Sequence, residues 1–589
     1  MFSWQRRVRK GLILLVTLGA ISKAEFWPFP PKRFIGNALL DAGSLGLGND
    51  ERAVAFGDFN GDQFLDVVTL DASGRRVTIH LWNHGDFIFS DAASFSHSEQ
   101  IYNVVPGDFT HDGTLDLLVM SRGPSSSVIN IEVYVGSPGN GFVSPPISVP
   151  SSNAAQPIPL DANDILLVCD EEGTSNKYFQ IWRNDKSEGF TLAQFGRLPS
   201  GVQVISFADM DRDGTIDMVF ATCASVSSST GIGKDCYINI AYNQQLPLCA
   251  SPANTAAFTR FPLTDIFPSN ELLVLDTRSS PPVPLPLRLG DANLDGFPDL
   301  LFVTATVPRG GFLGIGETRD RTPRLVLSTS CMNGIPGCDN QGSGRVGWKP
   351  VKKDANALSD VADASGVAFL DIDEDGTLDV MVQRTGEQGQ GPILFVQNNF
   401  FFDAFFLKAI VLNGACDNGW CSRPNGTGHY HPFGVSYSGA SFKYTILDTK
   451  GARSAAQVAQ LPQTAYQALL PPYAFFGLGR TNNYIENLFV GSTLHSASDS
   501  PEKEQAHFVN MEGVIPNSKV VIYPPTHVDG AWRRELYLRP GAWIPWVTLT
   551  VIVTVVLLAV VVFVLHLNEK RADELERRRA SHHINFDAL

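Results

Sequence analysis

A nine-residue acidic motif that occurs five times constrains the fold of this 589-residue chain more than any other feature. Every copy has Asp at positions 1, 5 and 9 and Asp, Asn or Thr at position 3. The last four copies also have Gly at position 6, which supplies a sharp turn. Oxygen atoms at alternate positions of a tight loop converge on one point, and Ca²⁺ accepts such oxygen ligands at about 2.3–2.6 Å, a backbone carbonyl at position 7 included. We therefore predict five calcium loops whose ligands at positions 1, 3, 5, 7 and 9 are, copy by copy, Asp58, Asn60, Asp62, Phe64 and Asp66; Asp108, Thr110, Asp112, Thr114 and Asp116; Asp209, Asp211, Asp213, Thr215 and Asp217; Asp291, Asn293, Asp295, Phe297 and Asp299; and Asp371, Asp373, Asp375, Thr377 and Asp379.

The residues after the motif distinguish it from an EF-hand loop. An EF-hand needs a bidentate Glu at position 12 and a helix on each side, whereas position 12 here is Thr69, Val119, Phe220, Phe302 or Val382. The residues that follow position 9 are mostly β-branched or apolar, which is typical of a buried strand. The sequence therefore predicts a strand–calcium loop–strand unit, with acidic turns that cap strands without metal as the alternative. For a degenerate sixth copy at Asp161-Ala-Asn163-Asp164, the capping interpretation is favoured.

The interval between the copies predicts the architecture. The copies start at residues 58, 108, 161, 209, 291 and 371, so the first intervals are close to 50 residues and the last two are longer. A unit of about 50 residues with several short strands is typical of a propeller blade. Six units and closure by the N-terminal segment predict a mainly β chain with a seven-bladed propeller over residues 25–401. Alternating apolar patches such as Phe442–Ile446 predict a smaller, membrane-proximal β-sandwich module over residues 402–530.

Both ends of the chain carry targeting signals. Residues 1–24 combine basic residues, a short apolar run and small residues before Glu25, which is typical of a signal peptide. Val547–Leu565 is an uncharged apolar run long enough to cross a bilayer, and basic residues follow it. We predict a type I single-pass protein with a transmembrane helix over 543–567 and a cytoplasmic tail over 568–589. The plasma membrane is the expected location, with a membrane of the secretory pathway as the alternative.

The cysteines and the charge agree with a lumenal or extracellular body. All eight cysteines lie between the two apolar segments, and an even number in an oxidising compartment favours disulfides over the competing zinc site. Cys331 with Cys338 and Cys416 with Cys421 close short loops and are the expected pairs, while the pairing of Cys169, Cys223, Cys236 and Cys249 stays open. The sequon at Asn425 predicts glycosylation. A net charge of −15 disfavours nucleic acid as a partner.

The motifs also carry a family resemblance. The acidic loops, the first preceded by Phe56-Gly57, resemble the FG-GAP repeats of integrin α-chain propellers. The chain as a whole resembles the T-cell immunomodulatory protein (linkin) family in the segments Phe405–Lys408, Tyr444-Thr445, Gln460–Gln463, Pro472-Tyr473, Phe476–Arg480, Ile515–Ser518 and Phe586–Ala588. Departures from the family pattern lie mainly in insertions at 223–235 and 307–348. The resemblance implies a cell-surface glycoprotein linked to adhesion and to the modulation of T cells.

These features favour a binding protein over an enzyme. Neither a Gly-x-Ser-x-Gly, a His-Glu-x-x-His nor a P-loop motif occurs, and the paired carboxylates lie within the predicted metal loops. We expect a calcium-stabilised adhesion or receptor ectodomain that binds a protein ligand on the extracellular or lumenal side. A lumenal trafficking or assembly factor of the secretory pathway is the alternative. A signalling receptor is a third reading, which would need a partner recruited to the short tail.

Overall fold

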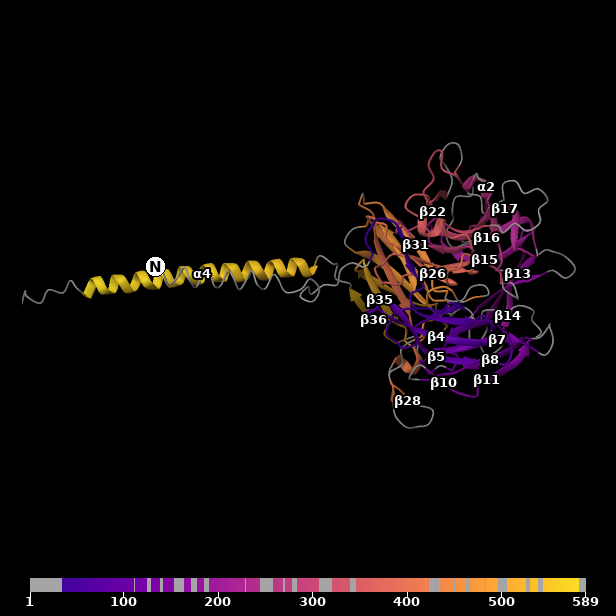
Figure 1. The fold of residues 1–589 in the computed structure, drawn as a ribbon, viewed down its shortest axis with the longest axis horizontal. Coiled ribbons are helices and arrows are strands. Elements are labelled where there is room, and N and C mark those ends of the chain that lie inside the picture. Colours follow the sequence, from indigo (N-terminus) through magenta and orange to yellow (C-terminus); the bar gives the residue numbers. More distant parts are fainter. Residues whose placement is uncertain are drawn as a thin grey trace, which may run out of the picture.

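The computed structural model describes residues 34–581 with gaps at 111, 124–128, 138–140, 153–163, 171–176, 185–189, 228, 244–257, 268–270, 278–282, 307–319, 339–345, 419, 423–428, 431–434, 450, 462–466, 468, 482–483, 496–505, 526–529 and 539–543. The predicted signal peptide, Asn425, and Asp161 and Asn163 of the degenerate copy lie outside the described residues. The described part is mainly β, with one long apolar helix at its C-terminal end (Figure 1).

The first three sheets follow one another along the chain and are antiparallel. The first sheet has the order β2-β3-β4-β5, the second β11-β8-β7-β6 and the third β12-β13-β14. Their strands are β2 (Glu51–Gly57), β3 (Asp66–Asp71), β4 (Arg76–Asn83), β5 (Ile88–Ser96), β6 (Ile101–Gly107), β7 (Asp116–Arg122), β8 (Ile129–Tyr134), β11 (Ile147–Ser152), β12 (Asp164–Asp170), β13 (Lys177–Asn184) and β14 (Phe190–Arg197), with a small hairpin of β9 (Gly136–Ser137) and β10 (Gly141–Phe142). β3 and β7 are the apolar runs after the acidic motifs, and both are almost wholly buried.

The next strands are joined into one extended sheet, and the last sheet of this part includes the N-terminal strand. The extended sheet runs from β15 to β23. β1 pairs with β26, Leu39 opposite Asn398, in a sheet of order β1-β26-β25-β24. The elements are β1 (Leu39–Gly43), β15 (Val202–Ala208), β16 (Asp217–Val226), β17 (Ile232–Ala241), β18 (Phe258–Pro262), α2 (Leu263–Ile266), β19 (Leu272–Val274), β20 (Arg288–Gly290), β21 (Asp299–Ala305), β22 (Arg321–Thr329), β23 (Gly347–Pro350), α3 (Asn356–Ser359), β24 (Ala364–Leu370), β25 (Asp379–Arg384) and β26 (Ile393–Asn398).

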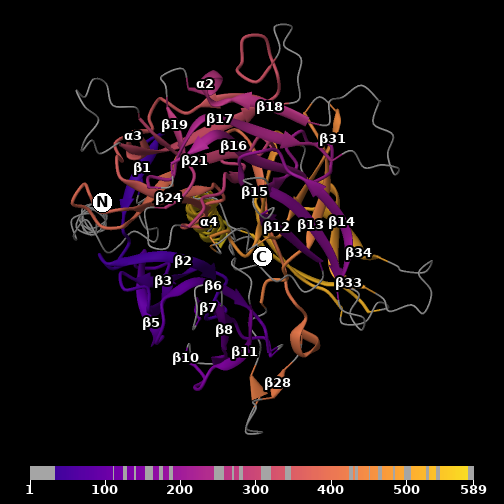
Figure 2. The ribbon, with the colours of Figure 1, turned by 90° about the vertical axis from the view of Figure 1, so that its right-hand side faces the viewer.

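These sheets succeed one another around the molecule in sequence order (Figure 2). Apolar side chains fill the space between the first sheet and two of its neighbours. One cluster joins Phe56 and Trp82 of the first sheet to Phe395 of the last, and another joins Ile79 of the first sheet to Leu117 of the second. The first sheet therefore packs on the second and on the last, which brings segments more than 300 residues apart into one core.

The remaining strands form a second unit, which we call the C-terminal module (residues 405–538). Two four-stranded sheets, of order β32-β27-β35-β36 and β31-β30-β33-β34, share a core that includes Leu407, Phe442, Phe476 and Ile522. β30 alternates half-buried and buried residues, as the sequence pattern predicts. β36 continues the first of these sheets to Leu538, past the boundary at 530 expected from the sequence. The elements are β27 (Phe405–Val411), η1 (Ala415–Asn418), β28 (Cys421–Ser422), β29 (His429–Tyr430), β30 (Ser441–Leu447), β31 (Arg453–Ala459), β32 (Ala474–Gly479), β33 (Ile485–His495), β34 (Ala506–Val514), β35 (Ser518–Tyr523) and β36 (Arg533–Leu538).

Within the described residues, three disulfides stabilise this body. The structure contains both short-loop pairs expected from the sequence, Cys331–Cys338 and Cys416–Cys421. It also joins Cys223 to Cys236, which lie opposite each other on β16 and β17. The sequence left this third pair open, because only the strand register brings the two residues together.

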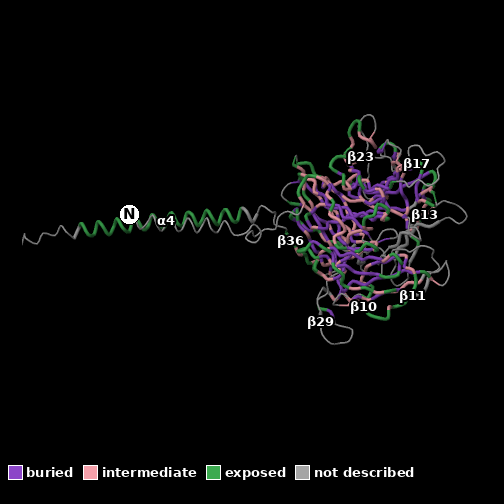
Figure 3. The backbone as a smooth tube through the Cα atoms, viewed as in Figure 1, coloured by how far each residue is buried: buried purple, intermediate pink, exposed green. Residues whose placement is uncertain are grey.

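The C-terminal helix α4 (Ile544–Ser581) extends away from the body, and its apolar part is exposed (Figure 3). Val547–Arg579 is long and apolar enough to cross a membrane. An exposed apolar helix of this length fits a single-pass membrane protein. The helix continues without a break through the basic residues that follow the apolar run.

Candidate metal centres

The five acidic motifs form equivalent loops between paired antiparallel strands. We call them loop 1 (58–66), loop 2 (108–116), loop 3 (209–217), loop 4 (291–299) and loop 5 (371–379). In each, the first strand ends just before position 1 and the second strand begins at position 9. The local sequence dictates this arrangement, because the polar loop interrupts two runs of apolar residues that pair with each other.

The backbone is left-handed at position 6 of all five loops and at position 4 of the four loops in which that position is described. Position 6 has φ between 79° and 89° at its four glycines, and φ of 68° at Gln63. Position 4 has φ of 76° at Gly61, 57° at Arg212, 63° at Leu294 and 59° at Glu374. The sequence predicted the turn at position 6 from its glycines. It did not predict the turn at position 4, where Gly, Arg, Leu and Glu all adopt the left-handed conformation.

The carboxylate at position 9 ties each loop to its own sheet. One oxygen accepts a backbone N–H from position 2 or 3 of the loop, at 2.8–3.0 Å. The other oxygen accepts a backbone N–H from near the end of the following strand or just after it, donated by Trp82, Gly136, Asn243, Ser328 or Asn398 at 2.7–2.9 Å. Position 9 therefore holds the loop closed and retains acceptor capacity, since an ionised carboxylate offers about four lone-pair sites.

The carboxylates at positions 1 and 5 shape the loop itself. Position 5 accepts the N–H of position 7 in all five loops, at 2.8–2.9 Å. Position 1 accepts the N–H of position 6 in loops 1 to 4, at 2.6–2.9 Å. These bonds direct the side chains of the loop inward.

The carboxylates converge most closely in loops 3 and 5. Oxygens of Asp209, Asp211 and Asp217 lie within 4.8 Å of one another, and so do those of Asp371, Asp373 and Asp379. Within the described residues, three acidic side chains meet in this way only in these two loops, and position 5 belongs to neither group. Loops 1, 2 and 4 place Asn or Thr at position 3, so that they have one carboxylate fewer.

Burial makes these carboxylates costly without a cation. Burial, with a smaller contribution from neighbouring aspartates, raises the pKa of Asp209 and of Asp217 to about 7. Burial and then Asp62 raise the pKa of Asp58 to about 6, and burial raises that of Asp116 to about 6. The pKa values of Asp66, Asp291, Asp299 and Asp379 are raised well above 3.8 for the same reasons.

These donors fit a hard divalent cation. Two full charges 4.8 Å apart repel by about 3 kcal/mol at an effective dielectric constant of about 20, and a bound cation would convert this repulsion into attraction. All the converging atoms are oxygens, the ligands that Ca²⁺ prefers, and the set lacks the sulfur and imidazole ligands that zinc sites use. In loops 3 and 5, positions 1, 3 and 9 are the groups that the structure brings close enough together to share such an ion.

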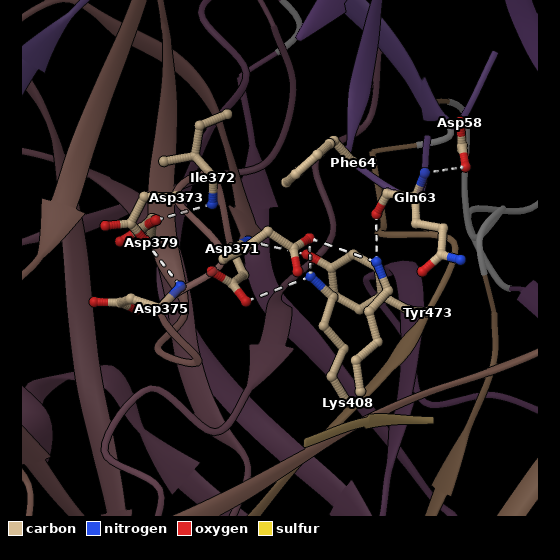
Figure 4. Close-up of polar contacts among 12 residues, drawn as sticks. Asp58, Gln63, Phe64, Asp371, Ile372, Asp373, Asp375, Asp379, Lys408 and Tyr473 are labelled. Atoms are coloured by element: carbon tan, nitrogen blue, oxygen red, sulfur yellow. Dashed lines mark hydrogen bonds and ion pairs between the residues drawn. The ribbon is translucent and has the colours of Figure 1, made fainter. Parts of the chain in front are cut away.

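The C-terminal module lies directly against the loops. The Lys408 ammonium contacts Glu374 at 2.5 Å and Asp371 at 3.4 Å, and it lies over the ring of Tyr473, 3.8 Å from its centroid (Figure 4). Burial alone would lower the pKa of Lys408, but the charges of Asp371 and Glu374 raise it above its ordinary value. Tyr473 also accepts the N–H of Asp371 at 3.0 Å.

Sequence reasoning did not connect these residues to the loops. Lys408, Tyr473 and Gly477 were noted only as parts of the segments that carry the family resemblance. In the structure these segments lie against the acidic loops, so the two sets of motifs form one site. The segments that contain these residues could be recognised in the sequence, but nothing in the sequence showed that residues so far apart along the chain lie in contact.

Comparisons with known proteins agree with these features. An FG-GAP-like repeat model matches residues 58–119, and a model described as ITFG1, C2 domain, matches residues 432–537. The human T-cell immunomodulatory protein is 27% identical over 607 residues, which cover 91% of this chain and 92% of the relative. A T-cell immunomodulatory protein of Macaca fascicularis is 32% identical over 311 residues, 52% of this chain and 91% of the relative. Protein linkin of Caenorhabditis elegans is 24% identical over 302 residues, 51% of this chain and 47% of the relative.

Among solved structures, an α-L-arabinofuranosidase from Fusarium graminearum covers 62% of this chain and 98% of its own length, with 10% identity and a TM-score of 0.28. A likeness at this level carries no argument about activity.

The fold and the loops define a mainly β, FG-GAP repeat protein with one apolar C-terminal helix that fits a membrane span. The chain belongs to the T-cell immunomodulatory protein (linkin) family.

Proposed function

We propose that this chain is a type I membrane glycoprotein whose calcium-stabilised ectodomain binds a protein partner in cell adhesion or immune modulation. The observation that carries the proposal is the set of five equivalent loops with buried carboxylates, three of which converge in each of loops 3 and 5, on a body next to an exposed apolar helix. The names of the relatives support the cellular setting, and the loops support a rigid binding scaffold instead of a catalytic site.

The scaffold that we propose is a propeller over residues 25–401. The described sheets follow one another around the molecule, and β1 pairs with β26, so the N-terminal strand completes the last sheet (Figure 2). This pairing would close the ring and fix both ends of the propeller. The count of seven blades stays a prediction, since β1 adds a strand to the last sheet and does not begin a sheet of its own.

The C-terminal module would form a separate domain, a β-sandwich from about 402 to 538. Its two sheets share one core, and the C2-domain match at 432–537 falls within it. The signal peptide at 1–24, a glycan at Asn425, a transmembrane helix at 543–567 and a tail at 568–589 complete the proposed organisation, with the plasma membrane as the location.

Calcium would act as a structural ion in these loops. The ligands proposed for it are positions 1, 3, 5, 7 and 9 of each loop, and the affinity expected for an extracellular module is about 10⁻⁴–10⁻³ M. The degenerate copy before β12 is not proposed as a site.

Proximity labelling in living cells tests the proposed function. A peroxidase inserted after residue 24 of the full chain would label neighbouring proteins, and a D217N/D379N variant is the matched control for the calcium loops. We expect labelled partners at the cell surface that are depleted for the variant. Labelling confined to internal membranes would instead support a trafficking or assembly factor. If the variant labels the same surface proteins as the unaltered chain, the proposed role of calcium is contradicted.

A further inference from the structure

The C-terminal module covers the acidic loops through the same carboxylates that are proposed to hold calcium. The first Asp of loops 2, 3, 4 and 5 lies against this module. Asp108 accepts a hydrogen bond from the Asn413 side chain at 2.7 Å, and Asp209 accepts the backbone N–H of Gln457 at 2.8 Å. Two carboxylates in different sheets are thus held by one neighbouring module.

Loop 4 fits against the module more tightly than loops 2 and 3. The backbone of Gly477 lies so close to Asp291 that a Cβ built there would sit 1.7 Å from the Asp291 carboxylate oxygen. Two residues further on, Gly479 donates its N–H to the carbonyl of Leu294 at 2.7 Å. Only glycine fits at 477 without displacing the proposed calcium ligand.

Loops 5 and 1 are contacted by two lysines of the module. Lys408 contacts Asp371 and Glu374, as described above. Lys519 donates to the carbonyl of Gln63 in loop 1, and its ammonium lies 3.8 Å from Glu374 in loop 5. Loop 1 belongs to the first sheet and loop 5 to the last, so these contacts cross the junction where the proposed ring closes.

We propose that calcium binding in the loops and docking of the C-terminal module are thermodynamically linked. This inference rests on the proposed calcium sites. A cation would hold the position-1 carboxylates in the orientation that the module contacts, and its removal would let neighbouring carboxylates repel one another and leave that orientation. Because a coupling between two sites is reciprocal, the docked module in turn raises the affinity of the loops for calcium.

The linkage assigns a role to each face of the molecule. The face that carries the loops is an internal interface, so it is not the surface that receives a protein partner. A partner would bind elsewhere on the propeller or the module. Calcium then controls how rigidly the module, and with it the connection to the membrane helix, is held.

Hydrogen exchange of the full chain in lipid nanodiscs tests the first half of the linkage. With chelator in place of calcium, β31 and β32, which contact loops 3 and 4, are expected to exchange about 10-fold faster. β34, which belongs to the same module and pairs with β33, is the internal control and is expected to stay unchanged. Equal acceleration in β34 would mean general unfolding of the module and would overturn the inference, as would unchanged exchange in β31 and β32.

Calcium titration of interface variants tests the reciprocal half. Gly477→Ala would wedge the module away from loop 4, and Asn413→Ala would remove the donor to loop 2 with little risk to folding. Gly366→Ala is the matched control, since its nearest neighbours would be 3.7 Å from the new Cβ. For the first two variants we expect the calcium affinity at one class of sites to fall by about 5-fold or more, and for the control we expect no change. Equilibrium dialysis with radioactive calcium measures these affinities.

The outcomes separate the two proposals. If the wild-type chain binds no calcium, the proposed calcium sites fail. If it binds calcium, and either the exchange of β31 and β32 or the affinity of the interface variants stays unchanged, the sites stand and the linkage fails.

Discussion

Loops 3 and 5 both have Asp at positions 1, 3, 5 and 9 and bring oxygens of positions 1, 3 and 9 within 4.8 Å of one another, yet their surroundings differ. In loop 3, position 4 is Arg212, which turns away to donate to the Asp295 carbonyl of loop 4 and to Ser454 of the module. In loop 5, position 4 is Glu374, which adds a fifth carboxylate to the loop, and Lys408 of the module forms an ion pair with it. The motif therefore sets how the carboxylates converge, while position 4 and the module set the charge around them.

Removing Lys408 is expected to produce the largest difference between the two loops. Lys408→Met leaves Asp371 and Glu374 buried without the ammonium that contacts both, and such a change typically costs about 3–5 kcal/mol. Lys443 of the same module lies beside Gly214 of loop 3 and is half-buried, so Lys443→Met is the matched control, with an expected cost below about 1 kcal/mol. Thermal unfolding of both variants in detergent measures the effect, and equal losses would contradict the special role of Lys408.

Replacing the position-9 carboxylates tests whether both loops hold calcium. Asp217→Asn and Asp379→Asn each remove a proposed ligand and a backbone acceptor, and each is expected to cost about 2 kcal/mol. Each variant should also bind one calcium ion fewer per chain by elemental analysis. Loss of an ion in Asp217→Asn but not in Asp379→Asn would show that Lys408 takes the place of calcium in loop 5.

Alanine at position 6 separates backbone strain from packing against the module. Gly214 and Gly376 have φ of 84° and 86°, so alanine at either is expected to cost about 1–2 kcal/mol. At 376 the new Cβ would also lie 2.0 Å from the ring of Phe406, whereas at 214 it would meet the flexible end of Lys443 at 2.7 Å. Gly376→Ala should therefore lower the unfolding midpoint more than Gly214→Ala, and an equal effect would contradict the tight packing at loop 5.

The pH dependence of the calcium-free chain gives the smallest expected effect. The pKa values of Asp209 and Asp217 rise from 3.8 to about 7 on folding, so the native chain binds more protons than the unfolded chain between these values. Its free energy of unfolding should therefore fall, by about 1 kcal/mol for the two groups together, as the pH rises from about 6.5 to about 7. Calcium-loaded chain should show the opposite trend, because protons compete with the ion, and a D209N/D217N variant should lose most of the calcium-free slope.

Much of the fold could be read from local sequence. The strands after position 9, the apolar helix and the disulfides Cys331–Cys338 and Cys416–Cys421 depend on residues close together in the chain. The Cys223–Cys236 pair could not be derived, because it depends on the register of β16 against β17. The left-handed turn at position 4 was also missed, since Arg, Leu and Glu there give no compositional signal.

The spacing of the acidic residues by itself determined where oxygen ligands gather and which strands flank them, because the backbone N–H groups of a nine-residue loop donate hydrogen bonds to the loop's own carboxylates. Only the tertiary structure decided what those loops face. Asp209 meets Gln457 and Asp371 meets Lys408 because separate sheets pack together, and no periodicity along the chain encodes such a contact. The counter-charge of a buried carboxylate is set by whichever residue the fold brings to it, and for loop 5 that residue comes from another module.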